Sequence, residues 1–449
     1  MSAEPGAVAW HPNHEQAGLK EVVSQEPARS SGELLDDWLV RLERRSPESR
    51  IDLGLDRVHQ VYRRLALSAP DCPVISVAGT NGKGSVVAMA EAIALAGGLK
   101  PFAFTSPHLL EFSERLRIAG RPAPDGEVVD ALDTVERARG EIALTYFEHV
   151  TLAGLVLASR SQPDLMLLEV GLGGRLDAVN VIDADVAVIT SIGLDHTEWL
   201  GPTRADIARE KAGIARKDRL VIIGERQRPP VLEQTLTQVG ARMMCVGKDL
   251  TWRLTESTLR VSCDNRQFVL PPPAMKGSWQ AGNAACAVAA LWALRTCLQL
   301  DEAAMATGLR TARLPGRFQQ ISTHPELIVD VAHNPPAARE LARALGLPDG
   351  RSYAVFSALS GKDIRAMGRA LDRCFSHWLI AGLGGDRGLS ARAIDRELAE
   401  TPVSGERETV ESVSRALDLA LERAGRQDRI VVFGSFMTVA EAWPTLIQY

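Results

Sequence analysis

The sequence lacks a long apolar run, paired cysteines and any surplus of basic charge. No segment approaches the ~18 consecutive apolar residues that a membrane-spanning helix needs, so we expect no membrane-spanning segment. The net charge is −5, and no basic tail or patch stands out, which argues against a nucleic-acid-binding protein. An anionic ligand would therefore need a local positive site.

Cysteine is scarce, and no two cysteines form a CxxC pair. The six residues are Cys72, Cys245, Cys263, Cys286, Cys297 and Cys374. Several of them lie in apolar runs, which is typical of reduced core residues in a cytoplasmic protein. We therefore expect neither a disulfide framework nor a zinc site, and we expect the protein to be cytoplasmic.

The chain has 449 residues, too many for one ordinary core, with 45% hydrophobic and 24% charged residues as in globular proteins. Residues 1–30 mix Pro, Gly, Glu and Gln without an apolar segment or a signal-peptide pattern, which predicts a disordered extension. A Pro-Gly break follows a helical pattern at Leu314–Gly316. We therefore expect one domain over residues 31–314 and a second over residues 315–449.

The most informative stretch is an apolar run, Val74–Ala78, followed by a glycine-rich turn and an apolar segment over residues 86–96. This order predicts a strand, an anion-binding loop and a helix. The loop consists of Gly79, Thr80, Asn81, Gly82, Lys83, Gly84 and Ser85. Backbone N–H groups and the helix N-terminus can hold phosphate there, and the lysine can reach the outer phosphates of a nucleotide.

One residue departs from the general phosphate-loop pattern, in which Ser or Thr follows the lysine directly. Here Gly84 stands between Lys83 and Ser85. The alternative is a tight strand-to-helix turn with a solvated lysine.

Further polar residues follow predicted strands in the same half of the chain. Ser106 follows an apolar segment that begins at Pro101, Glu169 ends the run from Leu165, and His196 follows the run from Val186. Strands that alternate with helices predict a parallel sheet, and ligands bind at the carboxyl edge of such a sheet. These side chains together with Lys83 suit a Mg-nucleotide site. Taken singly, Glu169 could be an ordinary strand-end charge and His196 could bond to backbone.

The remaining patterns carry less functional information. A helix is expected over Ala281–Leu298 with Asn283 near its start, and spacing alone places Lys211 on a solvated helix face. The fragments Gly171–Gly174 and Gly382–Gly385 do not complete a dinucleotide-binding motif. Predicted strands in the second half lie over Leu327–Val331, Tyr353–Phe356, Trp378–Ala381 and Ile430–Phe433. They indicate a smaller, doubly wound α/β domain.

Besides the Gly79–Ser85 loop, an ordered series of segments carries a resemblance to a known family. The segments are Thr105–Leu109, Leu168–Ala178, Leu194–Thr197, Arg209–Ile214, Pro315–Phe318 and Asp330–Pro335. From about Ser31 to the C-terminus the chain resembles the folylpolyglutamate synthases, in particular the bifunctional dihydrofolate synthases among them, which belong with the muramyl-peptide ligases. The extra glycine in the loop is typical of that group. The chain departs from its pattern at Val331 and at Ser360–Gly361.

The resemblance implies an N-terminal phosphate-loop ATPase-like domain with a mostly parallel sheet and a smaller C-terminal Rossmann-like α/β domain. It implies ATP and Mg²⁺, two ions in all, as cofactors. It further implies roles for individual residues. The nucleotide would be bound by Thr80–Ser85, Asn283, Arg317 and Asp330, and metal by Ser106, Glu169, His196 and a carbamylated Lys211. The incoming glutamate would lie at His333 and Ser435. The pterin would be bound by Asp52, Leu53, Gly54, Thr145, Tyr146, Phe147, Glu148 and Asp177.

The implied activity is the ligation of L-glutamate to dihydropteroate and to reduced folates. A carboxylate accepts an amine poorly, so ATP would first convert it to an acyl phosphate, with Lys83, Lys211 and His333 as the catalytic candidates. We expect small-molecule partners, no nucleic acid, and a monomer. Two alternatives remain: a muramyl-type amino-acid ligase, and a nucleotide-binding protein without turnover.

Overall fold

Alternating side chains on strand β1 (Val74–Ala78) face two separate apolar cores. Val74 and Ala78 pack in one core, and Ile75 and Val77 pack in the other. Successive side chains of a strand point to opposite faces, so this apolar run belongs to a sheet covered on both sides. The computed structural model describes residues 34–347, 350–401 and 403–449. The extension predicted over residues 1–30 lies outside them.

Within the described residues, β1 lies in the middle of an eight-stranded sheet. The six strands β2, β5, β1, β6, β7 and β8 are parallel, β3 pairs antiparallel with β2, and β4 pairs antiparallel with β3. The spatial order is β4 (Arg121–Pro122), β3 (Leu116–Ile118), β2 (Pro101–Phe104), β5 (Leu165–Glu169), β1, β6 (Val186–Ile189), β7 (Leu220–Ile223) and β8 (Arg242–Cys245).

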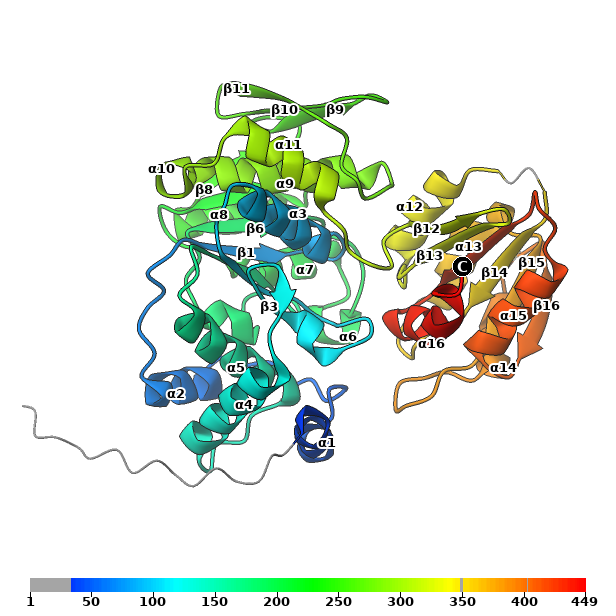
Figure 1. The fold of residues 1–449 in the computed structure, drawn as a ribbon, viewed down its shortest axis with the longest axis horizontal. Helices are drawn as coiled ribbons and strands as arrows, with labels where there is room; N and C mark the ends of the chain where they lie inside the picture. Colours follow the sequence, from blue (N-terminus) through cyan, green and yellow to red (C-terminus); the bar gives the residue numbers. More distant parts are fainter. Residues whose placement is uncertain (1–33, 348–349, 402) are drawn as a thin grey trace, which may run out of the picture. The chain divides into compact units, whose positions relative to one another are not determined.

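Helices cover both faces of this sheet (Figure 1). On the face of Val74 and Ala78 lie α1 (Leu35–Arg45), α2 (Asp56–Leu65), α4 (Asp125–Arg139), α5 (Tyr146–Ser161), α7 (Arg204–Ala212) and α8 (Pro230–Val239). On the opposite face lie α3 (Lys83–Ala96), α9 (Trp279–Ala293), α10 (Arg295–Leu298) and α11 (Glu302–Thr311). Short helical turns are η1 (Phe112–Arg115), η2 (Ala178–Val181) and α6 (Thr197–Leu200). A small antiparallel sheet adds β11 (Arg266–Leu270), β10 (Leu259–Cys263) and β9 (Thr251–Leu254).

The single helix predicted over Ala281–Leu298 is wrong in its extent. The helix α9 ends at Ala293, Leu294 leaves the helical backbone with φ −100° and ψ 12°, and α10 begins at Arg295. Both Leu294 and Leu298 stay buried in the same core. Both helices therefore pack against the same core despite the break between them.

The second half of the chain forms a six-stranded sheet that is parallel except for its edge strand β12. Its spatial order is β12 (Gln319–Thr323), β13 (Glu326–Asp330), β17 (Arg429–Phe433), β14 (Ser352–Phe356), β15 (His377–Ala381) and β16 (Glu406–Val410). The helical elements are α12 (Pro335–Leu345), α13 (Ile364–Leu371), η3 (Asp372–Cys374), α14 (Ala391–Ala399), α15 (Val413–Arg423) and α16 (Phe436–Leu446). The four predicted strands are confirmed. The edge strands escaped prediction because they carry no buried apolar run.

The predicted fold class, a mostly parallel α/β sheet followed by a smaller α/β sheet, is confirmed. Residues Leu34–Tyr449 form one structural unit, and the domain boundary at Leu314–Gly316 stays a prediction.

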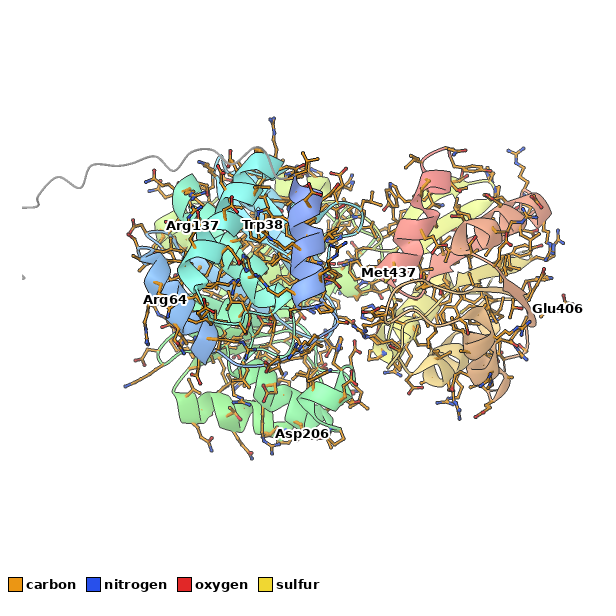
Figure 2. All side chains as sticks on the ribbon, turned by 90° about the horizontal axis from the view of Figure 1, so that it is seen from below. Trp38, Arg64, Arg137, Asp206, Glu406 and Met437 are labelled. Carbon is orange, nitrogen blue, oxygen red and sulfur yellow. The ribbon has the colours of Figure 1, made fainter. Side chains whose placement is uncertain are left out.

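All six cysteines are free thiols. Charged side chains such as Arg64, Arg137 and Glu406 point outward (Figure 2). In the part of the chain that the structure describes, no helix has the length and apolar character to cross a membrane.

Candidate active site

Four neighbouring strands bring the predicted site residues to one edge of the first sheet. The strands lie side by side in the order β2, β5, β1, β6. Ser106 follows β2, Glu169 ends β5, the Lys83 loop follows β1, and His196 follows β6. Carboxyl ends of parallel strands share an edge, so the structure brings these four residues to the edge where ligands bind.

The loop after β1 has a backbone that only glycine adopts readily. Gly79 has a φ of 156°, and a Cβ there would lie 1.8 Å from Thr190 Oγ1. Gly82 has a φ of 90°, and its Cβ would lie 2.6 Å from Asn283 Oδ1. The glycines therefore allow the loop to pass close to β6 and α9, as a loop that wraps phosphate must.

Hydrogen bonds anchor the loop to the end of β6. The Asn81 N–H donates to Ser191 Oγ over 2.9 Å, and Thr80 Oγ1 accepts from the Gly193 N–H over 2.9 Å. Lys83 Nζ donates to the carbonyls of Gly79 and Thr80 over 3.1 and 3.4 Å. The side chain of Lys83 therefore lies folded against the loop, with its ammonium group held by the loop carbonyls.

Glu169 is a buried carboxylate beside two cations. It is 5% exposed, and it accepts one hydrogen bond, from the Ser106 N–H over 3.3 Å. Burial raises the pKa of Glu169, whereas the charges of Lys83 and Arg317 oppose that rise. A Cβ added to Gly84 would lie 3.4 Å from Glu169 Oε2, so the extra glycine of the loop leaves room for this carboxylate.

The imidazole of His196 lies in a constrained loop. His196 has a φ of 51°, and its Nε2 lies 3.9 Å from Asp195 Oδ2. Burial and then the charge of Lys362 lower the pKa of His196 to about 3, so the ring is neutral and able to act as a ligand near neutral pH.

The residues at this edge of the sheet are suitable ligands for Mg²⁺, but they do not supply a full set of ligands by themselves. A hydroxyl, a carboxylate and a neutral imidazole, from Ser106, Glu169 and His196, offer few ligands. Among the described residues, no three His, Cys, Asp or Glu side chains form a metal-binding group. Mg²⁺ bound with nucleotide takes most of its ligands from phosphate and water, so a small protein set is what such a site needs.

The solvated position that spacing predicted for Lys211 is wrong. Lys211 is 3% exposed, and burial together with the charge of Lys83 lowers its pKa to about 7. The reason is a close approach between the loop after β5 and α7: a Cβ on Gly174 would lie 3.2 Å from Lys211 Cα. The glycine pair Gly173–Gly174 was the signal in the sequence for this packing, which the helical periodicity could not show.

The second half of the chain contributes Arg317 and Asp330. Asp330 accepts from the Phe318 and Ala332 N–H groups, each over 2.7 Å, and burial raises its pKa to about 6. Burial lowers the pKa of Arg317, against the attraction of Asp330 and Glu169. Arg317 thus lies within electrostatic reach of both halves of the site.

Two candidates at the second sheet already have local partners. His333 Nδ1 contacts Val331 O over 2.9 Å, which leaves Nε2 free to face Asp195 Oδ2 at 3.5 Å. Ser435 is buried, and its hydroxyl caps α16 by accepting from the Thr438 N–H over 2.9 Å. The histidine is therefore directed toward the site, whereas the serine has a structural bond of its own.

Arg57, which the sequence analysis missed, joins the two segments predicted to bind the pterin. Its Nε donates to both oxygens of Glu148 over 2.7 and 2.8 Å, and its Nη1 pairs with Asp52 Oδ2 over 2.9 Å. Glu148 also accepts from the Thr145 N–H over 2.8 Å. These carboxylates are thus engaged within the protein, and Arg57 holds Asp52–Gly54 against the start of α5.

Phe147 and Asp177 lie around the loop that follows Glu169. A Cβ on Gly171 would lie 2.5 Å from the Phe147 ring, so the ring covers that loop closely. Asp177 accepts from the Leu172 and Val179 N–H groups over 2.7 and 3.0 Å, and burial raises its pKa to about 6. Tyr146 is buried, and burial raises the pKa of its hydroxyl. The structure thus brings Phe147 and Asp177 to the same end of β5.

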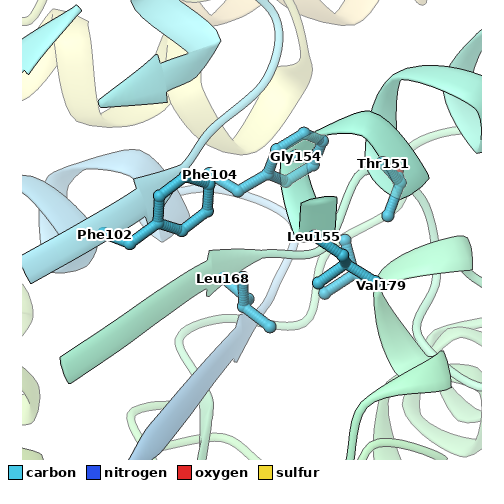
Figure 3. Close-up of a pocket in the computed structure, with 7 residues that line it drawn as sticks. All are labelled: Phe102, Phe104, Thr151, Gly154, Leu155, Leu168 and Val179. Carbon is cyan, nitrogen blue, oxygen red and sulfur yellow. The ribbon is translucent and has the colours of Figure 1, made fainter. Parts of the chain in front are cut away.

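A small pocket beneath this end of the sheet is part of the core. Its lining is apolar apart from one threonine, it is too small to hold a water molecule, and it lies between β2, β5 and α5 (Figure 3). The lining residues are Phe102, Phe104, Thr151, Gly154, Leu155, Leu168 and Val179. This pocket therefore marks packing under the site and offers no room for a substrate.

A glycine-rich strand-to-helix loop at the carboxyl edge of one parallel sheet, followed in the chain by a second α/β sheet, is the arrangement expected of a nucleotide-dependent ligase of the Mur type. Two family models match accordingly: the Mur ligase middle domain over residues 77–291, and the Mur ligase, glutamate ligase domain over residues 316–436.

Individual relatives indicate which kind of Mur-type ligase this chain is similar to. The dihydrofolate synthase/folylpolyglutamate synthase of Escherichia coli is 41% identical over 413 residues, which cover 90% of this chain and 94% of that protein. The structure of E. coli FolC with DHPP and ADP has a TM-score of 0.86 at 40% identity, covering 93% of this chain and 98% of that chain. A bifunctional folylpolyglutamate synthase/dihydrofolate synthase with Mn, AMPPNP and L-glutamate bound has a TM-score of 0.83 at 40% identity, covering 92% and 98%. The chain belongs to the dihydrofolate synthase/folylpolyglutamate synthase family.

Proposed function

We propose that this protein is an ATP-dependent ligase that joins L-glutamate to dihydropteroate and extends reduced folates with further glutamates. One observation carries the proposal: Ser106, Glu169, the Lys83 loop and His196 follow four adjacent parallel strands. That edge suits a nucleotide, and relatives of this family have been seen with ADP and DHPP and with AMPPNP, Mn and L-glutamate.

In the proposed reaction the γ-phosphate of ATP moves to the substrate carboxylate, which becomes an acyl phosphate. The glutamate amine then attacks the acyl carbon, the carbon–oxygen bond to phosphate breaks, and an amide, ADP and phosphate result. Lys83 and the loop N–H groups offset the charge on the moving phosphoryl group, and Arg317 and Asn283 hold the nucleotide. No side-chain nucleophile is needed.

The metal set in this proposal is Ser106, Glu169 and His196, with Lys211 serving once it is carbamylated. These residues would hold Mg²⁺, which would supply positive charge to offset that of the phosphates. The hydrogen bond from the Ser106 N–H fixes the orientation of the Glu169 carboxylate. His333, whose Nε2 faces the site, would orient the incoming glutamate amine, and Ser435 would lie at the same substrate.

Several further features belong to the same proposal. The pterin site would be formed by Thr145–Glu148, Asp52–Gly54 and Asp177. Arg57 joins the first two of these segments. We place the nucleotide domain over residues 31–314 and the glutamate-side domain over residues 315–449, and we expect a cytoplasmic monomer that acts on small molecules. The free cysteines support a cytoplasmic location, and the net charge of −5 supports small molecules rather than nucleic acid as partners.

The test is an assay of phosphate release from Mg-ATP by the purified protein. Release that requires both dihydropteroate and L-glutamate, with the glutamate adduct found by chromatography, is expected, and tetrahydrofolate should replace dihydropteroate. Release that depends on a muramyl-peptide precursor would indicate the muramyl-type ligase. Absence of release with every acceptor would indicate a nucleotide-binding protein without turnover.

A further inference from the structure

One carboxylate in the site, that of Asp195, has no role in the function proposed above. It lies in the loop between β6 and α6, next to His196, and its side chain is 9% exposed. Three groups from the second half of the chain surround it. Lys362 Nζ lies 2.7 Å from Oδ1, and Asn334 Nδ2 donates to Oδ2 over 2.8 Å, while His333 Nε2 lies 3.5 Å from Oδ2.

Two of these groups, Asn334 and Lys362, are buried. Asn334 is 1% exposed, and its Oδ1 accepts from the Ala337 N–H over 3.0 Å, which caps α12. The same amide exchanges hydrogen bonds with Asn81 of the phosphate loop. The side chain of Lys362 is 6% exposed. A cation buried to this extent needs its counter-charge, so the pair forms only when the two halves meet as they do here.

Two apolar contacts accompany the charged one. A Cβ on Gly193 would lie 2.8 Å from Pro336 Cγ, so the loop before Asp195 passes directly against the start of α12. Leu109, three residues after Ser106, is buried in the core that contains Val331 and Val439. Apolar contacts between the two halves thus accompany the charged contacts of Asp195.

We propose that Asp195 is a positioning residue that holds Lys362, Asn334 and His333 of the second half against the phosphate loop. Its carboxylate fixes the position of the glutamate side of the site relative to the nucleotide side. The proposal rests on the proposed function, since it assigns the contact to the ligation reaction. A buried ion pair adds little net stability, because its desolvation cost offsets its Coulombic gain, so we assign this one to positioning.

The experiment compares Asp195→Asn with Asp183→Asn, which removes a largely exposed carboxylate from its pair with Arg216. In Asp195→Asn we expect kcat for ligation to fall about 100-fold, because a small misplacement of reacting groups costs about that much. The ADP dissociation constant and the Mg²⁺ requirement should change much less than kcat, because the side-chain contacts that are lost are those to Lys362, Asn334 and His333 of the second half. Hydrogen exchange of the segment 332–345 should rise in Asp195→Asn and not in the control.

A second pair of variants tests the contact without changing charge. Gly193→Ala inserts a methyl group against Pro336 and should raise exchange in the segment 332–345 and lower kcat as Asp195→Asn does. Gly126→Ala is the control, because a Cβ there meets nothing within 4 Å. The double variant Asp195→Asn/Lys362→Met should be no slower than the slower single variant, since both remove the same contact.

Three results would overturn the inference. The first is a wild-type kcat in Asp195→Asn. The second is a large rise in the Mg²⁺ requirement of that variant with unchanged hydrogen exchange in the segment 332–345. The third is a loss of kcat in the double variant that equals the product of the two single losses. The proposed function fails separately, when the wild type itself releases no phosphate with dihydropteroate and glutamate.

Discussion

Asn81 and Asn334 exchange two hydrogen bonds between their side-chain amides, each 3.0 Å long. The first residue belongs to the phosphate loop, and the second follows His333 at the start of α12. A reciprocal amide pair satisfies the donor and the acceptor of both side chains at once, so it fixes the orientation of each amide. The loop that would hold ATP and the segment that would meet glutamate therefore share one hydrogen-bonded contact.

Lys83→Ala should stop ligation without unfolding the protein. The lysine is the cation of the phosphate loop, and loss of one such transition-state contact costs about 100-fold or more in rate. Phosphate release in the presence of both substrates measures the effect, and thermal unfolding checks the fold. Lys248→Ala, at an exposed lysine, is the matched control and should keep wild-type activity. Near-normal turnover in Lys83→Ala would contradict the assignment of the loop.

Glu169→Gln should raise the Mg²⁺ concentration needed for half-maximal activity by about tenfold or more, since an amide replaces the only carboxylate among the proposed ligands. The side chain keeps its size and can still accept from the Ser106 N–H. A Mg²⁺ titration of phosphate release measures this. Glu233→Gln, which alters a surface pair with Arg228, serves as the control. An unchanged metal requirement would exclude Glu169 as a ligand.

Arg57→Lys should weaken pterin binding while leaving the nucleotide site intact. Lysine cannot bond Glu148 and Asp52 together as the guanidinium does, so the segment Asp52–Gly54 should loosen. We expect KM for dihydropteroate to rise about tenfold, the loss of one charge-assisted contact, with KM for ATP unchanged. Arg63→Lys, at an exposed position of the same helix, is the control. Equal changes in both KM values would show a general structural defect.

Much of the first sheet and the loop could be predicted because their signals are local. An apolar run of five residues, two glycines that need unusual backbone and a lysine are visible within Val74–Ser85. That β2, β5, β1 and β6 are neighbours could not be derived in this way, since pairing depends on the whole sheet. The sequence showed that polar residues end strands, and the topology showed that the strands are adjacent.

The residues that the sequence analysis missed act through distant partners. Asp195 stands in a loop without periodicity, and its partner Lys362 lies 167 positions further along the chain. Arg57 belongs to an ordinary amphipathic helix and bonds a carboxylate 91 positions away. Lys211 received a role only from the family resemblance, because its spacing is that of a solvated helix face, yet a loop from another part of the chain covers it. In each case the deciding contact is long-range, and no local pattern encodes it.

Acid should destabilise the protein through His149. The ring is fully buried beside Trp38 and Arg45, and burial lowers its pKa from 6.5 to about 4. Between these two values the unfolded chain binds the proton and the folded one does not, so stability falls as pH decreases from 6.5 to about 4. The loss amounts to about 3 kcal/mol. Denaturant unfolding across this range should show a flatter pH dependence in His149→Gln, and His324→Gln, at an exposed ring, should behave as the wild type.

Lys211 should react with carbon dioxide near neutral pH. A pKa lowered to about 7 leaves roughly half of the amine unprotonated at that pH, and only the neutral amine can attack carbon dioxide. The carbamate so formed is an anion, which suits a buried position close to Lys83. Activity should therefore rise with added bicarbonate and fall as pH drops below 7, where the amine is protonated. Protein equilibrated with isotopically labelled bicarbonate should show a carbamate resonance by NMR that Lys211→Arg lacks and that Lys217→Arg, at an exposed lysine, retains. Full activity in Lys211→Arg, or the same spectrum in both variants, would mean that this lysine works unmodified.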